Sequence, residues 1–291
     1  MSNLFRIDIS KLGNGVGAEA YGGFLDAYSF LDIDQLDWFT LFIHRVKCSM
    51  DDKVFLPIIR IADGELRLLF PLLSFTPFKS RKKLLQSIKA LLLFVGLIGF
   101  KTSWGEAYSH QEALKYRYSY YLILKYFSRV GILALYWNNN ALNAFTDHAH
   151  KIENRLKKLG VVLNEDNYYP FHFPLAIFLR DGSVSILEGK KVLFVSSISH
   201  YEQDKVRLNL KRFNLKSINF LVIPKNSAHK LQVNCCGEYD IVFVSGGISS
   251  ISIIYQLRHL SCPCIDIGGV IHLLSGERSS YHGGFFHSLS F

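Results

Sequence analysis

Apolar runs alternate with amphipathic segments along the second half of the chain. Short runs rich in Val, Ile and Phe end in serine or glycine, and segments with helical periodicity lie between them. The predicted strands are residues 190–197, 217–224, 239–247 and 263–269, and the predicted helices are residues 200–213 and 249–260. This alternation predicts parallel βαβ units, whose strands are apolar because both faces are buried. We therefore predict an α/β fold with a Rossmann-like, mostly parallel sheet flanked by helices.

The first half is patterned less regularly. Residues 53–62, "KVFLPIIRIA", predict a strand rich in Ile and Val, and residues 131–137 predict a short one. Helical patterns cover "LDWFTLFIHRV" near the start and then residues 81–99, 110–130 and 148–160. We expect a single domain over residues 1–291. Residues 1–50 could form an N-terminal extension, and residues 180–190 contain the best internal boundary.

The most apolar run, residues 90–100, is about half the length that crosses a bilayer. Lys89 and Lys101 flank it. We interpret it as part of a buried helix, and the alternative is a surface that touches a membrane.

Charge and cysteine content narrow the class of protein. The formal net charge of +9 favours phosphate-bearing partners: nucleic acid, an anionic membrane surface or phosphorylated small molecules. The basic residues form short clusters, and no RNA-binding or zinc-finger signature is visible, so we expect no nucleic acid. Five cysteines, an odd number in a large chain, argue against a disulfide framework and indicate a reducing, cytoplasmic location.

Polar residues and glycines follow three of the predicted strands. They are the segments "ADGE" (62–65), "SGGISS" (245–250) and "DIGGVIH" (266–272). Ligands of doubly wound sheets bind outside the carboxyl ends of the strands. If the three strands belong to one parallel sheet, these segments therefore meet at one edge of it.

The segment "SGGISS" suits a phosphate. Gly246 and Gly247 would let the backbone approach it, and the following helix would offer free N–H donors. Ser249 or Ser250 could cap that helix. The alternative is a tight turn between strand and helix that binds no ligand.

The segment "ADGE" contains two carboxylates. Asp63 and Glu65 are two residues apart, so they point the same way if the segment is extended. Such a pair could hold a divalent cation beside a diphosphate, or one member could act as a general base. The alternative is an Asp-Gly turn followed by a glutamate that starts a helix.

The histidines are less informative. His148 and His150 could be metal ligands, but their place at a helix start favours the surface. His172 lies in the aromatic segment "YYPFHFP", which could be core or an acceptor-binding surface. No Gly-x-Ser-x-Gly or His-Glu-x-x-His motif supports a hydrolase or a zinc protease.

Three segments in order resemble the bacterial GT-D-type glycosyltransferases. They are "RIADGE", "GKKVLFVSSIS" and "DIVFVSGGISSISIIYQLRHLSCPCIDIGGVIHLLSGE". That family carries an Arg-x-x-Asp-Gly-Glu segment with an Asp-x-Glu metal motif, and later a strand that ends in Asp-Ile-Gly. The resemblance covers residues 54–276 and implies a GT-D-like fold. It also implies transfer of a hexose from a nucleotide sugar, of the UDP type, with Mn²⁺ or Mg²⁺.

The resemblance also implies roles for individual residues. Glu65 matches the metal-binding carboxylate, Asp63 matches the first acidic residue of the motif, and the pair would be catalytic. Arg60 would face phosphate or hold the carboxylates. The nucleotide-sugar side would comprise Arg60, Gly64, Ser245, Gly246, Gly247, Asp266, Gly268, Gly269 and His272.

Three positions depart from the family pattern. Ala62 replaces a common glycine, Gly269 stands where many members have His, and His272 stands where another branch has Gln. These departures leave the donor and the catalytic base open. The expected acceptor is a glycan, a glycoprotein or a lipid-linked molecule, and the last would bring the protein to the inner membrane surface. The competing hypothesis is a non-catalytic nucleotide-binding or scaffold module of a polysaccharide assembly system.

Overall fold

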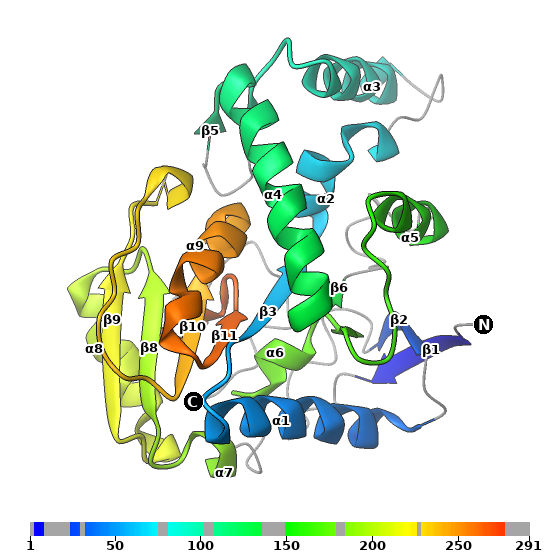
Figure 1. Ribbon diagram of the computed structural model, residues 1–291. Helices are drawn as coiled ribbons and strands as arrows, with labels where there is room; N and C mark the ends of the chain where they lie inside the picture. Colours follow the sequence, from blue (N-terminus) through cyan, green and yellow to red (C-terminus); the bar gives the residue numbers. More distant parts are fainter. Residues whose placement is uncertain are drawn as a thin grey trace.

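The computed structural model describes residues 3–8, 24–29, 33–74, 81–101, 107–135, 149–178, 184–225 and 228–276. Seven of its strands form one sheet in the order β7-β6-β3-β11-β10-β8-β9, and every neighbouring pair is parallel (Figure 1). The strands are β3 (Leu56–Ile61), β6 (Ile132–Leu135), β7 (Tyr168–Pro170), β8 (Lys191–Ser196), β9 (Ser217–Val222), β10 (Ile241–Ser245) and β11 (Pro263–Asp266). The predicted Rossmann-like α/β fold is confirmed.

Helices connect and cover these strands. They are α1 (Gln35–Asp51), α2 (Asp63–Leu69), α3 (Arg81–Phe94), α4 (His110–Val130), α5 (Ala149–Lys158), α6 (Phe173–Ala176), α7 (Val184–Leu187), α8 (His200–Asn209), α9 (Ser250–Gln256) and α10 (Val270–Leu274). Two small antiparallel pairs complete the described strands: β1 (Asn3–Asp8) with β2 (Phe24–Ser29), and β4 (Phe100–Lys101) with β5 (Ala107–Tyr108).

The sheet is covered on both faces, which explains its apolar strands. Every residue of β3, β6 and β11 is buried, whereas the edge strand β9 is partly exposed. Helices α4 and α9 contact each other and β3. The β8-α8-β9 and β10-α9-β11 units cross the sheet in opposite directions. Right-handed crossovers therefore place α8 and α9 on opposite faces.

Strands from both halves of the chain share this sheet. Pro263 pairs with Leu56 and Ile265 pairs with Ile58, which joins β11 to β3 across the 180–190 segment. Helix α1 belongs to the same core, because the Trp38 ring packs 5.6 Å from the ring of Phe173.

The prediction of a buried helix over residues 90–100 is wrong. Helix α3 ends at Phe94, and Leu91, Phe94 and Leu97 are 47%, 49% and 70% exposed. The helix instead packs its Ser87 and Ala90 side against the protein. Among the described residues, no helix is long and apolar enough to cross a membrane.

The cysteines behave as the sequence predicts. All five are free thiols, and Cys262 and Cys264, at the entry to β11, are fully buried. They fill the core as small apolar side chains.

Candidate functional site

The three strands that precede the polar segments are neighbours in the sheet. β11 lies between β3 and β10, so the segments after Ile61, Asp266 and Ser245 start at one edge (Figure 1). The predicted convergence is confirmed. The chain changes direction between the neighbouring strands β8 and β10, since β8 leads to β9 on one side and β10 leads to β11 on the other. Such a topological switch point is where doubly wound folds bind ligands.

Two buried residues of opposite charge, Arg60 and Asp266, lie at this edge. The Nη1 atom of Arg60 donates to the carbonyl of Ile267 at 2.7 Å, and the guanidinium lies 3.9 Å from the centre of the Phe171 ring. Oδ1 of Asp266 accepts from Oγ of Ser250 at 3.0 Å and from the N–H of Gly268 at 3.1 Å. Burial raises the pKa of Asp266, and the charge of Arg60 opposes this rise. Of the two roles predicted for Arg60, facing phosphate or holding the carboxylates, the structure favours the second.

Glu65 adds a second carboxyl group to this pair. It lies in the first turn of α2, where its Oε2 atom accepts from the N–H of Ala62 at 2.9 Å. Burial, and then the negative charge of Asp266, raise the pKa of Glu65 to about 7. The negative charges of the two acids therefore repel each other.

The expectation that Asp63 and Glu65 lie in an extended segment is wrong. Helix α2 begins at Asp63, and positions two apart on a helix point about 200° apart. The predicted alternative, a glutamate at a helix start, is the local structure that forms here. The Asp63 side chain is outside the described residues. In the described part of the chain, no group of three or more His, Cys, Asp or Glu residues is arranged to hold a metal ion.

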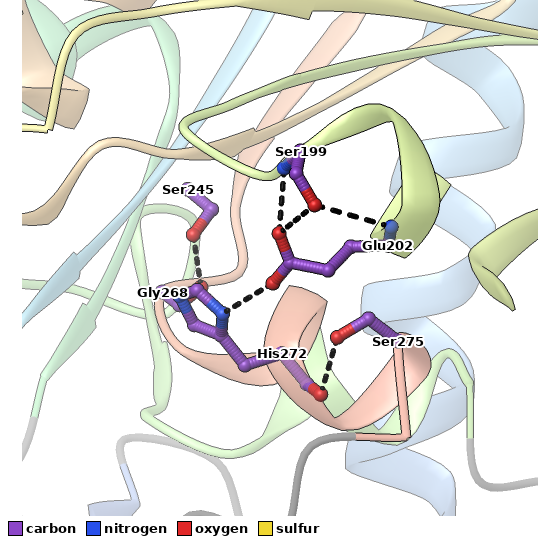
Figure 2. Close-up of polar contacts among 6 residues, drawn as sticks. All are labelled: Ser199, Glu202, Ser245, Gly268, His272 and Ser275. Carbon is purple, nitrogen blue, oxygen red and sulfur yellow. Dashed lines mark hydrogen bonds and ion pairs between the residues drawn. The ribbon is translucent and has the colours of Figure 1, made fainter. Parts of the chain in front are cut away.

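The turn after β10 is tied to the turn after β11. Oγ of Ser245 donates to the carbonyl of Gly268 at 2.6 Å (Figure 2). The N–H of Gly246 donates to Oγ of Ser250 at 3.1 Å, so Ser250 links Gly246 to Asp266. The prediction that Ser249 or Ser250 caps α9 is wrong. A 3-10 turn precedes this helix, and the side chain of its N-terminal cap residue, Ser249, accepts no capping bond.

The remaining predicted residues surround this edge. Nδ1 of His272, on α10, lies 3.8 Å from Oε1 of Glu202, beside the turn that starts α8 (Figure 2). Gly247 is exposed and has a φ of +55°, and Gly269 is partly exposed. Gly64 packs beside Ile248, which a Cβ would contact at 3.4 Å. The predicted residues of β3, β10 and β11 are therefore brought together.

Sequence reasoning missed three contributors. Ser250 was considered only as a helix cap. Glu202 caps α8 through the N–H of Ser199, and the Ser-x-x-Glu spacing is a signal that could have found it. Tyr120, on α4, is buried, and burial, followed by the charge of Glu65, raises its pKa. No sequence pattern indicates that this tyrosine belongs to the site.

No family model matches the chain, and no curated protein or solved structure matches it significantly. The resemblance to the GT-D family rests on the three sequence segments alone.

The close approach of Gly268 to Arg60 gives a testable consequence. Gly268 has a φ of +51°, and a Cβ there would lie 2.5 Å from Nη1 of Arg60. We expect Gly268→Ala to lower the free energy of unfolding by about 3 kcal/mol, from a strained backbone and a displaced guanidinium. Gly189→Ala is the control, since its φ is +69° and its Cβ would meet nothing within 4 Å. If urea denaturation shows the same loss of unfolding free energy for Gly268→Ala and Gly189→Ala, the close approach of Gly268 to Arg60 is contradicted.

His172 belongs to the core and not to an acceptor-binding surface, the other place that the sequence allowed. It is 3% exposed, whereas His148 and the side chain of His150 lie outside the described residues. Burial, and then the charge of Arg60, lower the pKa of His172 to about 3.

This depressed pKa predicts a loss of stability in acid. The unfolded chain takes up the proton near pH 6.5, so the stability that neutral His172 provides is lost as the pH falls from about 6.5 toward 3. The difference in unfolding free energy between the wild type and His172→Gln should shrink by about 2 kcal/mol between pH 7 and pH 5. The other ionisable residues are the same in both proteins, so their contributions to the pH dependence cancel in this difference. Parallel stability curves in urea would contradict the prediction.

Proposed function

We propose that this edge of the sheet binds a nucleotide sugar, of the UDP type, and transfers its hexose. The acceptor would be a glycan, a glycoprotein or a lipid-linked molecule of surface polysaccharide or glycoconjugate assembly. The observation that carries the proposal is the meeting of Glu65, Asp266 and Arg60 beside the glycine turns that follow β10 and β11, at the carboxyl edge of a parallel sheet. Five free cysteines suit the cytoplasm, where we place the activity.

The carboxyl groups fit a divalent cation. Glu65 and Asp266 together carry two negative charges when ionised, against one on Arg60. Burial, and then the charge of Asp266, raise the pKa of Glu65. Mn²⁺ and Mg²⁺ bind one or two carboxylates together with substrate phosphates. Glu65 and Asp266 would hold the ion. The ion would supply positive charge for the leaving nucleoside diphosphate.

The other residues of the edge would shape the donor site. The exposed Gly247 leaves backbone open to a diphosphate, since no Cβ blocks the approach. The bond from Ser245 to Gly268 fixes two turns relative to each other. Arg60 is already bound to Ile267, so we assign it to positioning Asp266 and not to direct contact with phosphate.

One observation favours a second candidate, a nucleotide-binding or scaffold module without turnover. Both carboxylates already accept bonds from the protein, Glu65 from Ala62 and Asp266 from Ser250 and Gly268. Such bonds are also what purely structural carboxylates make.

A screen of nucleotide sugars separates the two candidates. The purified full chain is incubated with each donor, with Mn²⁺ or with a chelator, and release of nucleoside diphosphate is measured. Metal-dependent release from one class of donor supports the transferase. Binding of a nucleotide without release, in the presence of acceptor extracts, supports the module.

A further inference from the structure

Helix α3 carries its apolar side chains outward. Leu85 and Ile88 are 61% and 45% exposed, whereas Ser87 and Ala90 are only 2% and 6% exposed. A helix on the surface of a soluble protein ordinarily buries its apolar stripe and exposes small polar residues. The described part of the chain therefore leaves the apolar side of α3 uncovered.

The outward residues of α3 and of the turn that follows it define a surface that we call the α3 face. It consists of exposed apolar residues of α3 and of the turn that follows it: Leu84, Leu85, Ile88, Leu91, Phe94, Val95 and Leu97. Residues 84, 88 and 91 follow the spacing of neighbours on one side of a helix. Contiguous exposed apolar surfaces of this kind mark sites of interaction with proteins or membranes.

The charges of the sequence segment that contains α3 indicate the kind of partner. Residues 66–105 contain no Asp and no Glu. The same segment contains the basic residues Arg67, Lys79, Arg81, Lys82, Lys83, Lys89 and Lys101. An acidic phospholipid layer has anionic headgroups over apolar acyl chains. It therefore complements an apolar surface that lies within a purely basic segment.

We propose that the α3 face docks the protein on an anionic membrane surface. At 14 residues α3 is about 21 Å long, too short to cross a bilayer, so it would lie in the plane of the interface. The apolar side chains would enter the headgroup boundary while the lysines contact lipid phosphates. A second copy of this chain is a poorer occupant, because two such basic segments would face each other.

Helix α3 is fixed to the helix that starts at the candidate site. Arg117, on α4, donates from Nε to the carbonyl of Leu68 at 2.6 Å and from Nη2 to the carbonyl of Leu93 at 3.2 Å. It thereby joins the end of α2 to the end of α3. Both helices lie at the end of the molecule toward which β3 runs (Figure 1). A docked molecule would hold the carboxyl edge of the sheet near the lipid, although docking itself does not depend on the proposed transfer.

Vesicle co-sedimentation of the full chain tests the proposal without any donor sugar. We expect binding to vesicles of phosphatidylglycerol and phosphatidylcholine, and much weaker binding to phosphatidylcholine alone. Leu85→Gln combined with Leu91→Gln should weaken binding at least tenfold, because two large apolar side chains no longer enter the interface. Lys89→Gln should weaken it about fivefold.

Leu208→Gln is the matched control. Leu208 lies on α8 and is 69% exposed, so its loss should leave vesicle binding unchanged. Circular dichroism of each variant checks that it is folded. Equal binding to neutral and anionic vesicles would overturn the proposal, as would unchanged binding of the Leu85/Leu91 double variant. It would also be overturned if the protein does not bind vesicles but forms a dimer that the double variant abolishes.

Discussion

Glu65→Gln is expected to lower metal-dependent release of nucleoside diphosphate at least about a hundredfold, with the fold intact. The amide oxygen can still accept the N–H of Ala62, so the start of α2 is preserved. The variant lacks the negative charge that would hold the cation and is no longer repelled by Asp266. Steady-state kinetics with the donor found by the screen, with Mn²⁺ added, provides the measurement.

The control for this variant is Glu165→Gln. Glu165 is an exposed residue of the loop before β7, away from the proposed donor site, and its replacement should leave turnover unchanged. Near-normal turnover of Glu65→Gln would rule out the metal role of this carboxylate. Unchanged thermal unfolding of both variants is required for the comparison.

Arg60→Met is expected to lower the free energy of unfolding by about 3–5 kcal/mol. The side chain is 9% exposed, donates to Ile267 and stacks on Phe171. Met keeps much of the volume but leaves the Asp266 carboxylate buried without its counter-charge. Urea denaturation measures the loss.

A double variant distinguishes loss of charge from loss of packing. Asp266→Asn in the Arg60→Met background removes the uncompensated charge, so it should recover part of the lost stability. A loss below about 1 kcal/mol for Arg60→Met alone would contradict the buried pair. A double variant as unstable as the sum of the single variants would show that the two residues are not coupled.

The sheet could be predicted because its strands are unusually uniform. Continuous Val, Ile and Phe runs such as residues 241–244 have no polar face, which only burial on both sides explains. Glycines after β10 and β11 marked the ends of those strands. The convergence of three segments then followed from the parallel topology alone.

The local structure of the site could not be predicted in the same way. Periodicity cannot show that Asp63 begins a helix, because the segment after Ile61 is too short to display a period. Ser250 reaches Asp266 only through tertiary packing, which no local pattern shows. The sequence alone assigns residues 90–100 to the core, because apolar composition does not distinguish a buried surface from an exposed apolar surface that binds a partner.

Titration of the protein with UDP, followed by its thermal unfolding, tests the central claim most directly. With Mn²⁺ present, saturating UDP should raise the unfolding temperature by several degrees, since a ligand that binds only the folded state at about 100 times its Kd adds about 2.7 kcal/mol. A chelator, or the Glu65→Gln substitution, should remove this shift. If UDP shifts the wild type equally with and without the metal, or no nucleotide shifts it under any condition, the metal-assisted nucleotide-sugar site is wrong.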